Sequence, residues 1–404
     1  MGSGSRLTSR CCHEITWPFS SCLPPWDIAR HQKCRRILIC SRYSLGEPHL
    51  ESVRRLDNNM TSENNGRDYV SHVVSNRAIR MDPVKSDLLN AWVVSESKIG
   101  TMSQCTGVAN NFGGPVLQKP VVVKHGISKY FSPRLFSSRE ARPDVIISCG
   151  FRSESHVIKM KRAFKSRPFI VHLQRPRVSG YDLVFVSNHD WTNEFDELPQ
   201  YERMVGVPHR LRAEEILLRR ENARRRYSPQ GRKIASVFVG GSNGAYVYDD
   251  RAISGVQDAV RTLADDDWQV LVSTSRRSDD ETLRRLREIE SPTVTVWDRC
   301  EPNPYIDYVA AADAFLITKD SVTMPCEALV TGRPVYSLDL SAVPGDRLVK
   351  FERFHRDLRE TLKLTRSFEG RLEAYSYSPL NEAKRIARVI ERRIGFQPGP
   401  LTGE

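Results

Sequence analysis

The stretch that decides the fold is Ile234-Ala-Ser-Val-Phe-Val-Gly-Gly-Ser-Asn-Gly-Ala245. An apolar run typical of a buried strand leads into a glycine-rich turn, and a helical pattern follows. In an open α/β sheet this order presents backbone N–H groups and a helix N-terminus to an anion, usually a phosphate. The three glycines lack the full G-x-G-x-x-G spacing. A plain tight strand-to-helix turn therefore stays open as the alternative.

A second apolar strand ends in hydroxyl and guanidinium groups, in the run Val270-Leu-Val-Ser-Thr-Ser-Arg-Arg277. In a parallel sheet this end would lie beside the glycine turn, and arginine forks suit phosphate or carboxylate oxygens. We expect ligand contacts from Ser273, Ser275, Arg276 and Arg277. The alternative is an ordinary helix N-terminus at the following serine, with solvated arginines.

A third segment, residues 314–321, predicts a buried strand that runs into a helix start. Such a helix would aim its positive end at the same crevice as the glycine turn. Asp320, Ser321 and Glu327 are therefore predicted ligand contacts. Glu327 would either meet a ligand hydroxyl or stay a structural carboxylate.

These segments, taken together, resemble those of a known protein family. The glycine turn, Ser-Thr-Ser-Arg-Arg, Glu301-Pro-Asn-Pro-Tyr305 and residues 318–327 resemble, in order and spacing, the mitochondrial fission "elongated mitochondria" (ELM-like) family. Further matches are Asp144-Val-Ile-Ile-Ser-Cys-Gly150, Phe169-Ile-Val-His-Leu-Gln-Arg-Pro-Arg177, Asp182-Leu-Val-Phe-Val186 with His189-Asp190, Lys350-Phe-Glu-Arg-Phe-His355 and Pro379-Leu-Asn-Glu382. The resemblance extends over residues 88–394.

The resemblance implies an α/β protein with two doubly wound parallel-sheet (Rossmann-like) domains facing each other, similar to the glycosyltransferase-B fold. The family includes bacterial proteins of unsettled activity and plant proteins that help recruit a dynamin-related GTPase to mitochondria. Members usually carry a loop with glycine, histidine and asparagine after the first strand. Here that loop is Ser95-Glu-Ser-Lys-Ile-Gly-Thr-Met-Ser-Gln104, without the histidine. Since fold does not fix function, the chemistry must come from the site.

The domain organisation follows from composition and from the alternation of short apolar strands with helical patterns. Residues 1–84 form an irregular leader, which is either a mis-assigned start, a targeting segment or a disordered extension. Residues 85–228 are the predicted N-terminal domain, and residues 229–377 the C-terminal nucleotide-binding domain. Residues 378–396 are predicted to form a helix that returns to the N-terminal domain.

A sugar transfer would need a general base from the N-terminal domain, and a group with a pKa near neutrality suits that task. The candidates are His172, His189 and Asp190, with His209 as a further histidine. Gln174 and Arg175 follow the strand of His172 and are predicted ligand contacts. The remaining predicted ligand contacts are Gly240, Gly241, Ser242, Asn243, Gly244 and Asn303.

The net charge indicates which kinds of partner to expect, and the cysteine content indicates the redox compartment. The net charge of +12 includes seven arginines between positions 210 and 226, interleaved with glutamates. A solvated helix face is the first interpretation, an acidic membrane surface or partner the second, and nucleic acid the third, because no aromatic platform accompanies the charge. Five of the nine cysteines precede residue 41, and no C-x-x-C pair occurs in the core. We therefore expect a reducing compartment, no metal and no cofactor.

Two functions are open at this stage. The first is metal-independent transfer of a sugar from a nucleotide donor, with a nucleoside-diphosphate ligand held by the C-terminal domain. The second is a non-enzymatic adaptor that recruits a dynamin-related GTPase. The expected location is cytoplasmic, or the mitochondrial outer surface if the source is eukaryotic.

Overall fold

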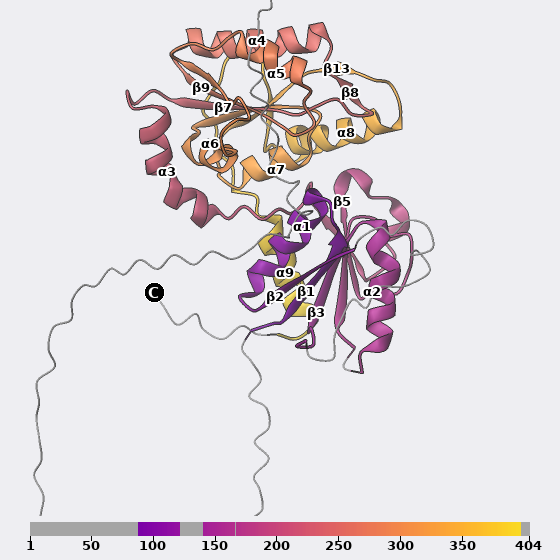
Figure 1. Ribbon diagram of the computed structural model, residues 1–404. Coiled ribbons are helices and arrows are strands. Elements are labelled where there is room, and N and C mark those ends of the chain that lie inside the picture. The colour runs from indigo at the N-terminus through magenta and orange to yellow at the C-terminus, as the bar shows by residue number, and fades with distance from the viewer. Residues whose placement is uncertain (1–87, 122–139, 166, 397–404) are drawn as a thin grey trace, which may run out of the picture. The chain divides into compact units, whose positions relative to one another are not determined.

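The computed structural model describes residues 88–121, 140–165 and 167–396, and these contain two parallel sheets flanked by helices (Figure 1). The predictions for the leader lie outside the described residues. In the described N-terminal part, six strands pair in the order β2-β1-β3-β4-β5-β6. These strands are β1 (Ala91–Glu96), β2 (Val116–Val121), β3 (Val145–Cys149), β4 (Phe169–Leu173), β5 (Leu183–Ser187) and β6 (Tyr201–Met204).

Both faces of this first sheet are buried at its central strands β1, β3, β4 and β5, which is why these are almost continuous apolar runs. Successive side chains point to opposite faces. Trp92 and Val94 pack with α2 (Phe151–Ala163), whereas Ala91 and Val93 face α1 (Ile99–Ala109). Helix α9 (Glu382–Arg393) packs on the same face as α1, through an apolar stripe that includes Ile386.

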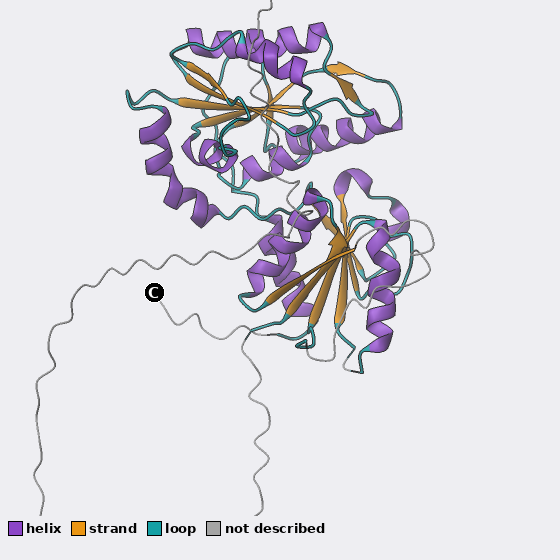
Figure 2. Ribbon diagram, in the orientation of Figure 1, coloured by secondary structure: helices purple, strands orange, loops and turns teal. Residues whose placement is uncertain are grey.

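The second sheet has the strand order β10-β9-β7-β11-β12-β14 within the described residues. Its strands are β7 (Ile234–Val239), β9 (Gln269–Thr274), β10 (Val294–Val296), β11 (Ala314–Thr318), β12 (Val335–Leu338) and β14 (Arg366–Ser367). A short antiparallel pair, β8 (Tyr246–Val247) with β13 (Ser341–Ala342), lies beside it (Figure 2).

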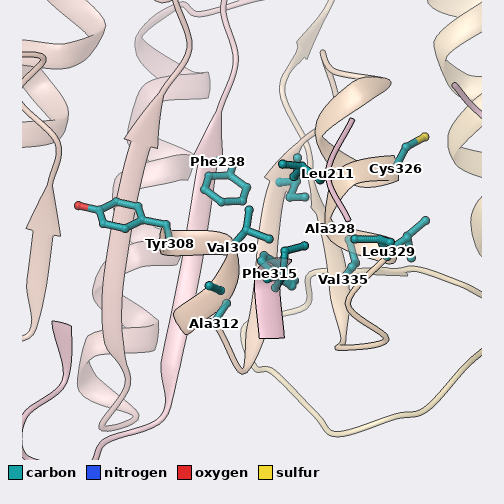
Figure 3. Close-up of a cluster of buried hydrophobic side chains, with 14 of the residues drawn as sticks. Leu211, Phe238, Tyr308, Val309, Ala312, Phe315, Cys326, Ala328, Leu329 and Val335 are labelled. Atoms are coloured by element: carbon teal, nitrogen blue, oxygen red, sulfur yellow. The ribbon is translucent and has the colours of Figure 1, made fainter. Parts of the chain in front are cut away.

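Helices cover both faces of the second sheet. Helices α4 (Asp250–Asp265) and α5 (Asp280–Arg287) pack on one face. Residues of α3 (Ala213–Tyr227), α6 (Tyr305–Ala311), α7 (Thr323–Leu329) and α8 (Asp346–Arg356) join the cluster on the other. Figure 3 shows part of this second cluster, in which Phe238 and Phe315 lie among small and aliphatic side chains. The predicted fold class, two doubly wound parallel-sheet domains, is confirmed.

The strand orders locate two topological switch points. The chain leaves β7 toward β9 on one side and returns to β11 on the other, and in the first sheet β1 lies between β2 and β3 in the same way. In open α/β sheets, ligands bind outside the carboxyl ends of the strands at such points. The glycine turn after β7 is therefore at the position where a ligand is expected.

Two details differ from the sequence prediction. Helix α4 does not follow the glycine turn directly but begins at Asp250, because the Asp249 side chain caps it by accepting the N–H of Ala252 at 2.9 Å. Helix α3 packs on the C-terminal sheet through Ile216 and Ala223. The turn-rich stretch after α3 suggested a boundary at residues 228–229, but packing joins α3 to the domain that follows it.

None of the helices in the described part is long and apolar enough to cross a membrane.

The core cluster of the second sheet gives the first prediction. Phe238 is fully buried and contacts the rings of Tyr305 and Phe315. Phe238→Ala should lower the free energy of unfolding by about 3–5 kcal/mol, since it leaves a cavity. Leu218→Ala, at a side chain that is 83% exposed, should change it by less than about 0.5 kcal/mol. Denaturant unfolding measures both, and equal effects would contradict the assigned core.

Candidate functional site

Asp320 occupies the switch point of the second sheet. Its side chain is fully buried, and Oδ2 accepts the N–H of Gly241 at 2.9 Å and a guanidinium N–H of Arg277 at 2.8 Å. Oδ1 lies 2.9 Å from the Tyr248 hydroxyl and 2.7 Å from the Thr318 hydroxyl. Burial beside this carboxylate raises the pKa of Tyr248, which keeps its hydroxyl protonated and able to donate. The carboxylate is thus held by four donors.

The glycines of the turn are required by this carboxylate. A Cβ atom at Gly240 would lie 1.8 Å from Asp320 Oδ2, and one at Gly241 would lie 2.3 Å from the backbone of Arg277. The N–H of Gly240 donates to the Thr318 hydroxyl at 2.9 Å. The acidic group against this turn is Asp320 of the chain itself, and Gly240, Gly241, Arg277 and Asp320 contact one another. Their roles as ligand contacts stay predictions.

Hydrogen bonds of the Asn243 side chain hold the tip of the turn in place. Asn243 Oδ1 accepts the N–H groups of the residues two and three positions later, at 2.7 and 3.0 Å, and its Nδ2 donates to the carbonyl of Asp320 at 3.0 Å. Gly244 lies against the side chain of Arg347 on α8, because a Cβ at this position would be 2.5 Å from Arg347 Nη1. Ser242 is exposed. The tip is therefore fixed next to a guanidinium.

A cavity of about 470 Å³ lies along the side of α8 that carries Arg347. It brings together three residues predicted from the sequence and three cations that were not predicted: Arg175, His189 and Asp190 with Arg347, Lys350 and Arg353. Lys350 forms an ion pair with Asp190 at 2.6 Å. Within the described residues, Arg347 and Arg353 have no carboxylate within 4.0 Å. Asp346 also lines the cavity, which therefore has four basic side chains against two carboxylates and is suited to an anion.

His189 is the histidine best placed to act at this cavity. Its ring packs edge-on against Phe354 at 5.4 Å, and Nε2 lies 3.8 Å from Asp190. Burial lowers its pKa, although the neighbouring carboxylates oppose the shift, and the Lys350 ammonium lowers it further. The ring is therefore neutral at physiological pH, which leaves a nitrogen lone pair to accept a proton.

The other two histidines are internal. His172 is 1% exposed, its Nδ1 lies 2.9 Å from Ser148 Oγ, and burial lowers its pKa to about 3. His209 is 4% exposed, its Nε2 donates to the Cys326 carbonyl at 3.0 Å, and burial lowers its pKa to about 4. His172 as a general base stays a prediction, and alternation along β4 turns its ring into the core.

The polar residues that follow β4 are engaged within their own domain. Gln174 has a positive φ of 81° and donates to Gln104 Oε1 at 3.1 Å. Arg175 pairs with Glu194 at 2.6 Å while it also lines the cavity. Of Gln174 and Arg175, it is Arg175 that lines the cavity and that a ligand could reach.

Several predicted ligand contacts make local bonds that support the loops. Ser275, Asn303 and Ser321 each accept a backbone N–H two or three residues later, at 3.0, 2.9 and 3.2 Å. Ser273 is buried within β9. Arg276 is exposed, and no ion pair is found for it among the described residues. The loop ends are therefore rigid, and Arg276 stays available to a ligand.

Glu327, on α7, has a carboxyl group whose pKa lies near neutrality. The Tyr305 hydroxyl donates to Glu327 Oε2 at 2.6 Å. Burial raises the pKa of Glu327 to about 7, although the Tyr305 bond and the charge of Arg210 oppose the shift. The side chain is partly exposed. Glu327 can therefore exchange a proton near neutral pH or accept a bond from a ligand hydroxyl.

The cations of α8 were missed in the sequence although a signal was present. Arg347, Lys350 and Arg353 recur at intervals of three residues, which places them on one side of a helix. Nothing in the sequence showed that this side would meet the glycine turn, about 100 residues earlier in the chain. In the described part of the chain, no three His, Cys, Asp or Glu side chains come together as a metal site requires.

Comparison with known proteins settles the family. A sequence profile described as Mitochondrial fission ELM1 matches residues 99–394. The chain belongs to this family. It is 27% identical over 278 residues to the Mitochondrial fission protein ELM1 of Arabidopsis thaliana, covering 62% of this chain and 64% of that relative, so it spans just under two thirds of its length. An uncharacterized protein of Rickettsia prowazekii (strain Madrid E) is 23% identical over 357 residues, covering 75% of this chain and 98% of that protein.

Two solved structures are also similar. The UDP-GlcNAc 2-epimerase of Methanocaldococcus jannaschii has a TM-score of 0.45 at 10% identity, covering 75% of this chain and 100% of that chain. The glycosyltransferase SnogD of Streptomyces nogalater has a TM-score of 0.40 at 13% identity, covering 77% of this chain and 96% of that chain.

The Asp320 network gives the second prediction. Asp320→Ala leaves the buried Gly241 N–H and Tyr248 hydroxyl without their acceptor, so it should lower the free energy of unfolding by about 2–3 kcal/mol, whereas the 45% exposed Arg277 side chain loses its partner at little cost. Asp258→Ala is the control, because this 72% exposed carboxylate makes a surface pair with Arg261 and should cost less than about 1 kcal/mol. Denaturant unfolding compares them, and a small loss for Asp320→Ala would show that the network is dispensable.

The Glu327 site gives the third prediction. Between pH 4.5 and about 7 the folded chain keeps a proton on Glu327 that the unfolded chain has lost. The free energy of unfolding should therefore fall as the pH rises through this window. Glu327→Gln should flatten that part of the profile and should stabilise the protein above pH 7. The same exchange at Glu221, which is 81% exposed, should leave the profile unchanged. Parallel profiles for wild type and Glu327→Gln would contradict the raised pKa.

Proposed function

We propose that this protein binds a nucleoside diphosphate, as part of a nucleotide-sugar, in the cavity along α8. The observation that carries the proposal is the pair of guanidiniums, Arg347 and Arg353, that face the cavity without a carboxylate partner in the described chain. Arg347 also touches the tip of the glycine turn. Charge-assisted bonds to phosphate oxygens are roughly twice as strong as neutral ones, which favours a diphosphate over an uncharged ligand.

Two further groups support a nucleotide in this position. The tip of the turn, at the exposed Ser242 and the half-buried Gly244, would offer backbone N–H groups to a phosphate. Glu327, in the helix that follows the neighbouring strand β11, does not line the cavity itself, and we propose that it accepts a bond from a ribose hydroxyl that extends beyond it. Its raised pKa makes this contact depend on pH near neutrality.

We further propose transfer of the sugar to an acceptor hydroxyl. In this step the acceptor O–H bond breaks, its proton passes to a base, and the oxygen forms a bond to the anomeric carbon. The bond from that carbon to the diphosphate breaks, and the diphosphate leaves with the electron pair. His189 is the candidate base because it is neutral and lines the cavity. Arg347 and Arg353 would stabilise the charge on the leaving diphosphate.

A second candidate function is an adaptor for a dynamin-related GTPase at the mitochondrial surface. The Arabidopsis relative carries mitochondrial fission in its name. On α3, Leu217 is 69% exposed and Leu218 is 83% exposed, as a protein-binding helix would have them. The absence of a histidine from residues 95–104 also favours this function. In this case purified GTPase should bind the wild type and should bind a Leu217→Ala, Leu218→Ala variant more weakly.

The diphosphate proposal gives the fourth prediction. A nucleoside diphosphate at about 100 times its dissociation constant should stabilise the chain by about 2.7 kcal/mol, which a thermal-shift screen detects. Arg347→Ala should weaken binding by about 1.5–3 kcal/mol, or roughly 10-fold to 100-fold. Arg276→Ala in the same series tests the exposed arginine predicted from the sequence. Arg225→Ala, at a 68% exposed residue of α3, is the charge-matched control.

The outcomes separate the two functions. Loss of affinity in Arg347→Ala with retention in Arg225→Ala supports the cavity. Equal losses would mean that the ligand responds only to net charge. If no nucleoside diphosphate or sugar conjugate shifts the unfolding of the folded full chain, the nucleotide proposal is wrong and the adaptor function takes its place.

A further inference from the structure

A second exposed feature lies beyond the carboxyl ends of β3 and β4, next to the switch point of the first sheet between β1 and β3. Phe151, which follows β3 and opens α2, is 47% exposed. Val178, in the segment that follows β4, is 41% exposed. Since β3 and β4 are neighbours and parallel, both side chains belong to the same edge of the sheet. Neither residue takes part in the diphosphate site proposed above.

Two guanidiniums lie on the exposed ring. The Cζ atom of Arg177 is 4.5 Å from the centroid of the Phe151 ring, and that of Arg152 is 5.3 Å away. Within the described residues, no carboxylate lies within 4.0 Å of either guanidinium. The carboxylates of Glu96 and Glu154 act on these guanidiniums only at longer range, so two positive charges that are not ion-paired flank an exposed phenyl ring.

A buried carboxyl group fixes this arrangement. Glu154 is 2% exposed, and its Oε2 accepts the backbone N–H groups of Arg177 and Val178 at 2.9 and 3.0 Å. Its other oxygen, Oε1, is buried without a hydrogen-bond partner. Burying a carboxyl group is unfavourable unless bonds compensate for it. Here its bonds hold the two residues that bring positive charge and apolar surface to Phe151.

We propose that the surface formed by Phe151, Arg152, Arg177 and Val178, here called the switch-point surface, docks on a bilayer that contains anionic phospholipid. The phenyl ring and the valine would enter the headgroup boundary, and the guanidiniums would bind lipid phosphates. The positive charge of this surface complements the negative charge of the lipid phosphates. The chain as a whole is also basic, with a net charge of +12. An exposed aliphatic side chain, Val178, directly after Arg177 favours a lipid surface over a polynucleotide. This inference does not depend on the proposed nucleotide site.

The test is co-sedimentation of the full chain with phosphatidylcholine vesicles, with and without phosphatidylglycerol, at physiological salt. Each basic residue near an anionic surface contributes about fivefold to binding, or about 1 kcal/mol. Arg152→Ala with Arg177→Ala should therefore lower the partition coefficient on anionic vesicles about 25-fold. Phe151→Ala should lower it severalfold on the same vesicles.

Matched controls come from α3. Arg225→Ala with Arg226→Ala removes the same net charge at residues that are 68% and 63% exposed, and Leu218→Ala removes an exposed apolar side chain. These variants should bind like the wild type. All exchanged side chains are exposed, so thermal unfolding midpoints should agree, and they verify that each variant is folded.

Three results would overturn the proposal. One is wild-type binding that is the same with and without phosphatidylglycerol. Another is an equal loss in the α3 controls, which would mean that net charge alone drives the attraction. The third is binding of a single-stranded oligonucleotide that depends on Arg152 and Arg177 while vesicles are ignored, which would make this a nucleic-acid surface.

Discussion

The buried carboxylate of Asp320 is the interaction on which the candidate site depends. It joins the end of β11 to the turn after β7, the two strands on either side of the topological switch point. A buried charge without partners would be strongly unfavourable, and this one receives two hydroxyls, a backbone N–H and a guanidinium. The turn is thereby fixed before any ligand arrives. Its tip stands next to Arg347 as a consequence.

This arrangement changes how a glycine-rich turn is interpreted. Glycines at 240 and 241 do mark a close approach of backbone to an anion, as the sequence predicts. The partner, however, comes from a carboxylate about 80 residues later in the chain, and a single sequence does not show which distant group fills a turn. The charge that a ligand would meet is supplied by α8 instead. Fixed loops and preorganised cations of this kind are what binding of a diphosphate requires.

Much of the fold could be predicted because parallel strands buried on both faces leave continuous apolar runs. The apolar runs at residues 234–239, 270–273 and 314–318 are the buried strands β7, β9 and β11. Strand β6 leaves a weak signal in the sequence because Tyr-Glu-Arg-Met is half polar and lies at the sheet edge. Strand β2 does so as well, since it is also an edge strand with exposed polar residues. The candidate site was predicted less well, because the burial of His172 and the neighbours of α8 are set by tertiary packing.

A crystal structure of the full chain with a bound nucleoside diphosphate would test this site directly. Phosphate density is expected within hydrogen-bond distance of Arg347 and the N–H groups of Ser242 and Gly244, with Asp320 still bonded to Gly241. Phosphate density at the N–H groups of Gly240 and Gly241, with the Asp320 carboxylate displaced, would contradict it. In that case the turn would be a phosphate loop that its own carboxylate closes in the free protein.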